Sequence, residues 1–125
     1  NLVTKLTGYS RVIDVRNSVT VLEDLIGVVR QVVERKLEGV FHATNPGTLS
    51  HREILRLYRE QVDPDHHCEF IAEKDLVTLG LATAPRSSAV LSSEKLAATG
   101  IHMRPVQEAV HDALEQYRRA VHAKR

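Results

Sequence analysis

The chain carries the stretch TNPGTLSHREIL at residues 44–55, and this stretch decides its fold. Its first part, Asn-Pro-Gly, is typical of a turn, so we expect a strand at residues 40–43 to end there. Ser50 and Glu53 have the spacing of a capping box, in which each side chain accepts a hydrogen bond from the backbone amide of the other residue. The stretch therefore predicts a strand, a polar turn and a helix that ends near Val62.

Two further stretches place polar residues beside predicted elements. Residues 11–15 predict a strand, and the run NSVTVL at residues 17–22 predicts the start of a helix over residues 20–37, with Thr20 and Glu23 as its capping box. Apolar residues recur in that helix over a wide stripe, so we expect it to be largely buried. The third stretch, APRSS, falls in a predicted loop at residues 82–88. Ligands of open α/β proteins bind at the connections between the ends of strands and the following helices, so all three stretches are candidates for a ligand-binding site.

The second half of the chain predicts short elements before one long helix. We expect an extended piece at residues 69–71 and short helices at residues 73–79 and 92–98, each followed by a glycine. A final helix is expected from Pro105, where the missing amide proton of proline costs nothing. Together these elements predict an α-rich α/β fold in which short strands pack against helices.

Composition excludes several functional classes. The 125 residues allow one domain at most, and a formal net charge of +1 lacks the clustered positive charge of a nucleic-acid-binding protein. The single cysteine, Cys68, excludes an internal disulfide and fits a reducing compartment, so we expect a cytoplasmic protein. No apolar run approaches the ~20 residues of a membrane span.

The chain starts at Asn1 within an amphipathic segment, which predicts a piece of a longer polypeptide; removal of a tag or a start methionine is the alternative.

The order of these motifs resembles the C-terminal part of the extended short-chain dehydrogenase/reductases. The resemblance is to the branch of dTDP-4-dehydrorhamnose reductase and the plant nucleotide-rhamnose epimerase/reductases. It covers nearly the whole chain up to about residue 114 and rests on four stretches in the same order and spacing: residues 1–6, 17–23, 44–55 and 84–96. The chain departs from the family pattern at Val19 in place of Met, at Arg52 in place of Asn, and at Ser88-Ala89 in place of paired Asn.

The resemblance implies that residues 1–125 are the substrate-binding domain of an NADP- or NAD-dependent enzyme that reduces a 4-keto nucleotide-sugar, with or without 3,5-epimerisation. The chain contains neither the Gly-x-x-Gly-x-x-Gly turn that seats a dinucleotide nor the Tyr-x-x-x-Lys pair that moves protons. In the family both lie upstream, on the Rossmann lobe. We therefore expect no cofactor binding and no catalysis by this chain alone. A non-catalytic regulatory or interaction subunit of the same fold family is the rival interpretation.

Five residues are candidates for substrate contact. Arg86 is the first, because a guanidinium donates two hydrogen bonds to phosphate oxygens and a nucleotide-sugar carries a diphosphate. Ser87 accompanies it in the same motif, and Thr44, Asn45 and Asn17 lie at the predicted ends of strands. The structural alternatives are a surface ion pair for Arg86, turn formation for Thr44 and Asn45, and the start of a helix for Asn17.

Other partners follow from the same interpretation. We expect the upstream Rossmann lobe and a nucleotide-sugar as partners, and a homodimer through the apolar surface that the lobe would otherwise cover. The run of residues 66–68, His-His-Cys, is interpreted as a solvated loop, because three adjacent residues point in different directions and cannot share a metal ion.

Overall fold

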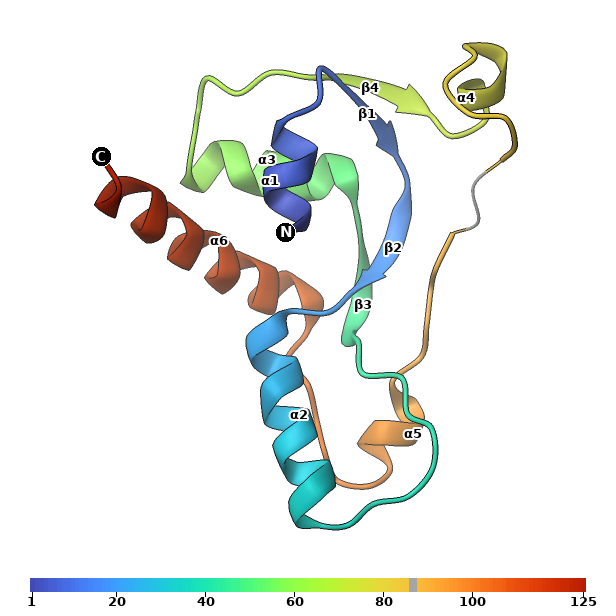
Figure 1. The fold of residues 1–125 in the computed structure, drawn as a ribbon, viewed down its shortest axis with the longest axis vertical. Helices are drawn as coiled ribbons and strands as arrows, with labels where there is room; N and C mark the ends of the chain where they lie inside the picture. The colour runs from blue at the N-terminus through green and yellow to red at the C-terminus, as the bar shows by residue number, and fades with distance from the viewer. Residues whose placement is uncertain (86–87) are drawn as a thin grey trace.

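A computed structural model describes residues 1–85 and 88–125 as an α/β fold (Figure 1). In these ranges the helices are α1 (Leu2–Thr7), α2 (Leu22–Glu34), α3 (His51–Gln61), α4 (Asp75–Thr78), α5 (Glu94–Ala97) and α6 (Val106–Ala123). The strands are β1 (Arg11–Asp14), β2 (Arg16–Val19), β3 (Asn45–Ser50) and β4 (Glu69–Ala72). Short strands with packed helices confirm the predicted fold class.

The strands form two separate pairs. β1 pairs in parallel with β4, so that Val12 lies opposite Phe70, which confirms the predicted strand and the predicted extended piece. β2 pairs antiparallel with β3, so that Asn17 lies opposite Leu49. Figure 1 shows β1 running directly into β2, so one continuous extended segment serves both pairs.

The prediction of a strand at residues 40–43 and a turn after it is wrong, because the strand is β3 at Asn45–Ser50. β3 contains Pro46, which cannot donate to a ladder but is tolerated near the start of an edge strand. Gly47 has a φ of +97°, and a Cβ there would lie 3.1 Å from Val106 Cγ1 of α6. Turn-forming residues therefore serve here to let a strand approach a helix closely.

The predicted start of the second helix is also wrong. Residues 16–19 form β2, and α2 begins at Leu22 and ends at Glu34 instead of running from 20 to 37. Thr20 makes no capping box, because its hydroxyl donates to Ala43 O at 2.8 Å. The Asn45 side chain takes the capping role instead, accepting a hydrogen bond from Val21 N at 2.8 Å.

The apolar face of α2 is largely exposed, which contradicts the prediction of a buried helix. Within the helix only Val28 is buried. Four residues with helical spacing remain between 53% and 69% exposed; they are Leu22, Ile26, Val29 and Val33, and we call them the α2 stripe. Periodicity correctly predicts one apolar face, but nothing in the described part of the chain covers it.

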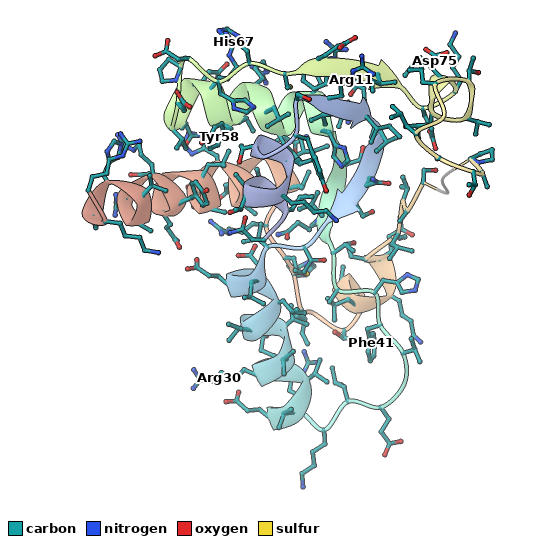
Figure 2. All side chains as sticks on the ribbon, turned by 45° about the horizontal axis from the view of Figure 1, so that its top comes forward. Arg11, Arg30, Phe41, Tyr58, His67 and Asp75 are labelled. Atoms are coloured by element: carbon teal, nitrogen blue, oxygen red, sulfur yellow. The ribbon has the colours of Figure 1, made fainter. Side chains whose placement is uncertain are left out.

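The predicted capping box of the third helix is confirmed. Ser50 Oγ accepts from Glu53 N at 3.1 Å, and Ser50 N donates to Glu53 Oε2 at 2.7 Å. Ile54, Leu55 and Tyr58 are buried, as predicted. The Tyr58 ring packs on that of Tyr117 in α6, with centroids 6.2 Å apart, and Figure 2 labels Tyr58 in this region.

Two apolar clusters form the core. The larger joins α1, β1, β3, α3 and α6, and its buried members are Leu6, Val12, Leu49, Ile54, Leu55, Tyr58, Val106, Val110 and Leu114. The smaller joins α2, α5 and the segment before α6, and its buried members are Val28, Leu96, Ile101 and Met103. Because the two clusters are separate, the contacts that join them determine the shape of the domain.

Asn45 connects the two clusters through its side-chain amide. It is fully buried, with 0% of its surface exposed. Its Nδ2 donates to Asp24 Oδ2 at 2.7 Å and to Arg104 O at 3.0 Å, while its Oδ1 accepts from Val21 N. Arg104 in turn pairs with Asp24 at 2.8 Å and with Asp112 of α6. The hydrogen bond from Arg104 lowers the pKa of Asp24, so this carboxylate stays charged in the network.

A segment after the APRSS motif lies along β2. Ser18 N donates to Ala89 O at 2.8 Å, and Leu91 N donates to Ser18 Oγ at 2.7 Å. Ala89 N donates to Asn17 Oδ1 at 2.9 Å. The first and third predicted motifs are thus brought together by side chains of β2, and we call residues 89–91 the β2-bound segment.

The Asn45 network predicts a large loss of stability in Asn45→Ala. The truncation leaves Val21 N and Arg104 O buried without their partner, which costs about 2–4 kcal/mol of unfolding free energy. Urea denaturation followed by circular dichroism measures this loss. The matched control is Asn1→Ala, which removes an exposed cap bonded to Thr4 N at 2.9 Å and costs about 1 kcal/mol. Equal losses in the two variants would contradict the role given to Asn45.

The β2-bound segment predicts local loosening in Ser18→Ala. Since one such hydrogen bond contributes about 0.5–1.5 kcal/mol, amide exchange at Leu91 should accelerate roughly 3- to 10-fold. Hydrogen exchange followed by NMR measures this rate. Ser92→Ala is the control, because Ser92 Oγ accepts from Glu94 N at 3.2 Å, so this substitution should leave the Leu91 amide unchanged. Similar rates in wild type and Ser18→Ala would show that the segment is held by other contacts.

Candidate functional site

A hollow of about 610 Å³ lies against one side of β1 and β2. Its walls come from α1, β1, β2, α4 and the segments on either side of the APRSS motif. The residues that line it are Leu2, Lys5, Leu6, Tyr9, Arg11, Val12, Ile13, Val15, Asn17, His51, Ile71, Leu76, Leu81 and Ala89. We call it the β2 hollow.

Polar groups of the β2 hollow are few and mostly basic. Lys5 projects from α1, and Arg11, labelled in Figure 2, lies at the start of β1. Arg11 Nε lies 3.3 Å from Glu69 Oε2, but both side chains are more than half exposed, so this pair is weak. The hollow therefore presents two cations close to an apolar wall, which favours an anionic ligand with a non-polar part.

His51 contributes one ring nitrogen to the fold. Its Nδ1 lies 2.8 Å from Ile13 O, and because a carbonyl oxygen can only accept, Nδ1 carries the proton. In a neutral ring Nε2 is then an acceptor. His51 is thus fixed in orientation at the wall of the hollow by the backbone of β1.

The chemistry available in the β2 hollow is binding. Apolar walls with a small number of placed polar groups are typical of small-molecule sites, and the volume falls within their range of about 300–1,000 Å³. Asn17 is the one predicted contact residue that lines it among the residues described. Leu81, three residues before the APRSS motif, and Ala89, directly after it, also line the hollow. Arg86 and Ser87 themselves lie outside the described residues.

Thr44 and Asn45 lie elsewhere. Both are buried at the start of β3, and within the described ranges neither lines the β2 hollow. The side chain of Asn45 already makes hydrogen bonds to Val21, Asp24 and Arg104. The Thr44 hydroxyl is buried and has no hydrogen-bond partner among the described residues. The structure thus separates these two residues from Asn17, although the same pair of strands carries all three.

Sequence reasoning missed Lys5, Tyr9 and Arg11. No pattern in the sequence marks these residues as ligand contacts, and they converge because β1 pairs with β4 and α1 packs on the same cluster. His51 carried a weak signal as the residue after a cap. A basic side chain on each of two adjacent short elements is too common a pattern to indicate a site.

The chain offers little to a metal ion or a dinucleotide. In residues 1–85 and 88–125, no group of three or more His, Cys, Asp or Glu side chains could hold a metal ion. The connection from β2 to α2 holds Thr20 and Val21 instead of a glycine-rich turn, and Val21 N is already bonded to Asn45. This connection therefore does not form the glycine-rich turn that seats the pyrophosphate of a dinucleotide. Over the same ranges, no helix has the length and apolar character needed to cross a membrane.

Comparison with known proteins relates the chain to rhamnose synthesis. No family model matches it. It is 33% identical over 111 residues to the bifunctional dTDP-4-dehydrorhamnose 3,5-epimerase/dTDP-4-dehydrorhamnose reductase of Arabidopsis thaliana, a match that covers 88% of this chain and 36% of that protein. It is 35% identical over 97 residues to a trifunctional UDP-glucose 4,6-dehydratase/UDP-4-keto-6-deoxy-D-glucose 3,5-epimerase/UDP-4-keto-L-rhamnose-reductase of the same plant, covering 77% of this chain and 14% of that protein.

A solved structure gives the same result for the fold. The crystal structure of a UDP-rhamnose synthase from Acanthamoeba polyphaga mimivirus superposes with a TM-score of 0.81 and 30% sequence identity. The match covers 92% of this chain and 39% of that one, so the chain spans well under half of these relatives. The chain is therefore a homologue of the dTDP-4-dehydrorhamnose reductase and nucleotide-rhamnose epimerase/reductase branch, and it corresponds to a C-terminal part of those proteins.

Proposed function

We propose that this chain is the substrate-binding lobe of an NAD(P)-dependent nucleotide-sugar epimerase/reductase that reduces a 4-keto sugar nucleotide. The activities named for its relatives support the substrate class. The observation that carries the proposal is the β2 hollow, which is lined by Asn17 and Ala89, the residue directly after the APRSS motif, together with Lys5 and Arg11. Such a surface suits a ligand with a diphosphate and a less polar ring.

In this proposal the APRSS motif contacts the substrate. Arg86 donates to the diphosphate through its two-pronged guanidinium, and Ser87 adds a hydroxyl. Asn17 acts beside them, because its Oδ1 holds the amide of Ala89 just after the motif. Substrate contact by Thr44 and Asn45 stays a prediction, and since both are buried it would require the start of β3 to open.

The reaction itself belongs to another part of the polypeptide. A nicotinamide cofactor bound there would supply the hydride. The residues of this chain bind and orient the sugar nucleotide, and they provide no general acid–base pair of the Tyr-x-x-x-Lys type. This lobe therefore governs affinity and specificity, whereas the rate of hydride transfer depends on how well the two parts are aligned.

The α2 stripe is proposed to be the surface against which that other part packs. Four exposed aliphatic side chains on one helix face form an apolar patch that soluble monomers seldom leave open. When the 125-residue chain is produced alone, the same patch remains exposed to solvent, and a second copy of the chain can pack against it. The proposed homodimer is thus a property of the isolated lobe.

Arg86→Ala in the complete polypeptide tests the substrate site. The KM for the nucleotide-sugar should rise roughly 10- to 100-fold, because a charged hydrogen bond contributes about 1.5–3 kcal/mol, while the KM for NAD(P)H stays unchanged. Arg118→Ala, an exposed position on α6, is the matched control and should leave both constants unchanged. Unaltered substrate kinetics in Arg86→Ala would remove this residue from the site. A complete polypeptide without any reductase activity would favour a regulatory subunit instead.

Ile26→Glu tests the α2 stripe. Sedimentation velocity of the 125-residue chain should show a dimer for the wild type and a monomer for the variant, because a carboxylate in the middle of the patch would have to be buried unpaired. Val40→Glu is the control, since Val40 is exposed but lies outside the stripe, and it should remain dimeric. A wild-type chain that stays monomeric at high concentration would contradict self-association through α2.

A further inference from the structure

A second hollow, of about 530 Å³, lies on the outer side of α3. Within the described ranges it shares no lining residue with the β2 hollow. Arg52, Arg56 and Arg59 line it from successive turns of one helix face. Loop residues 66–68 and Phe70 of β4 line it from the other side, and Figure 2 labels His67 there. We call it the α3 hollow.

Positive charge dominates the α3 hollow. Three guanidinium groups line it, against the carboxylate of Glu60. Arg56 pairs with Glu60 at 3.2 Å, but both side chains are more than half exposed, so water and a ligand can compete for this pair. Arg59 makes no ion pair with any residue that the structure describes. The side chain of Arg59 is therefore available to an external anion.

Arg52 is held in a defined position. Its Nε donates to Asp14 Oδ2 at 2.8 Å, and its guanidinium carbon lies 4.2 Å from the centre of the Phe70 ring. An ion pair and a cation–π contact together restrict its rotamers, which lowers the entropy cost of binding. The Arg52 side chain is thus already ordered before any ligand binds.

The remaining lining groups add no negative charge at neutral pH. Burial raises the pKa of the Cys68 thiol, outweighing the opposite effect of Arg52 and Arg59, so the thiol remains neutral. His66 packs its ring edge on Tyr58 with centroids 5.4 Å apart, and its Nε2 is buried without a hydrogen-bond partner among the described residues.

We propose that the α3 hollow binds a diphosphate-class anion, held between Arg52, Arg56 and Arg59. Guanidinium groups match the oxygens of phosphate in a forked geometry, and three of them on one helix face can hold both phosphoryl groups at once. None of these arginines is assigned to the nucleotide-sugar. The α3 hollow is therefore a second anion site of this chain, independent of the proposed function.

Titration of the ¹⁵N-labelled 125-residue chain with inorganic pyrophosphate tests the proposal. The amides of α3 and of residues 66–70 should shift and saturate, with a Kd on the order of 1 mM or tighter. Arg59→Gln should weaken binding roughly 10-fold, because it removes a charge-assisted fork, and this exposed position tolerates the change without unfolding. Arg30→Gln, an exposed arginine of α2 labelled in Figure 2, is the matched control and should bind as the wild type does.

Three results would overturn the proposal. The first is a shift that grows linearly without saturation, and the second is an equal loss of affinity in Arg30→Gln. The third is full affinity in Arg59→Gln. A parallel titration with UDP identifies the source of the anion: tighter binding of UDP than of pyrophosphate, lost in Arg59→Gln, indicates a nucleotide diphosphate, and equal binding indicates the free anion. Unchanged pyrophosphate binding in Asn17→Ala would separate this site from the β2 hollow.

Discussion

The side-chain amide of Asn45 is the contact on which the arrangement of this domain depends. A buried amide is costly unless both of its ends are bonded, and here both are. Its oxygen accepts from Val21 N just before α2, and its nitrogen donates to Asp24 in the first turn of α2 and to Arg104 O in the segment before α6. The strands belong to one apolar cluster and α2 belongs to the other. The polar contact that joins the two clusters therefore determines the orientation of α2 relative to the strands. Apolar packing alone is non-directional and could not set that orientation.

The elements that the sequence predicts well are those stabilised locally. The capping box of α3 and the apolar spacing of α3 and α6 lie within one helix each, so they can be interpreted without knowledge of the rest of the molecule. The elements predicted wrongly depend on distant partners. β3 replaces the predicted turn because β2 pairs with it, and α2 starts late because Thr20 and Val21 bond to Ala43 and to the Asn45 side chain. Periodicity likewise predicts which face of α2 is apolar, but it carries no information on what covers that face.

The candidate site shows the same division. Asn17 was predicted to start a helix, whereas it lies on a strand, and its Oδ1 accepts a hydrogen bond from the amide of Ala89 directly after the APRSS motif. Thr44 and Asn45 have the composition of ligand-facing residues, yet the fold places them in its interior. Lys5, Tyr9 and Arg11 reach the β2 hollow through a parallel strand pairing between distant parts of the chain, which no local pattern reveals. Residue type thus predicts which residues are candidates for ligand contact, whereas topology decides which residues line the hollow.

The β2-bound segment has a consequence for solubility. A two-stranded sheet has an open edge on each side, and unpaired backbone groups on such an edge form a template for intermolecular pairing that leads to aggregation. Residues 89–91 lie on the free edge of β2 and occupy the amide of Ser18, so another chain cannot add a strand at that position. The stretch that follows the APRSS motif therefore also blocks the addition of a strand from another chain, which is the first step of amyloid-like growth.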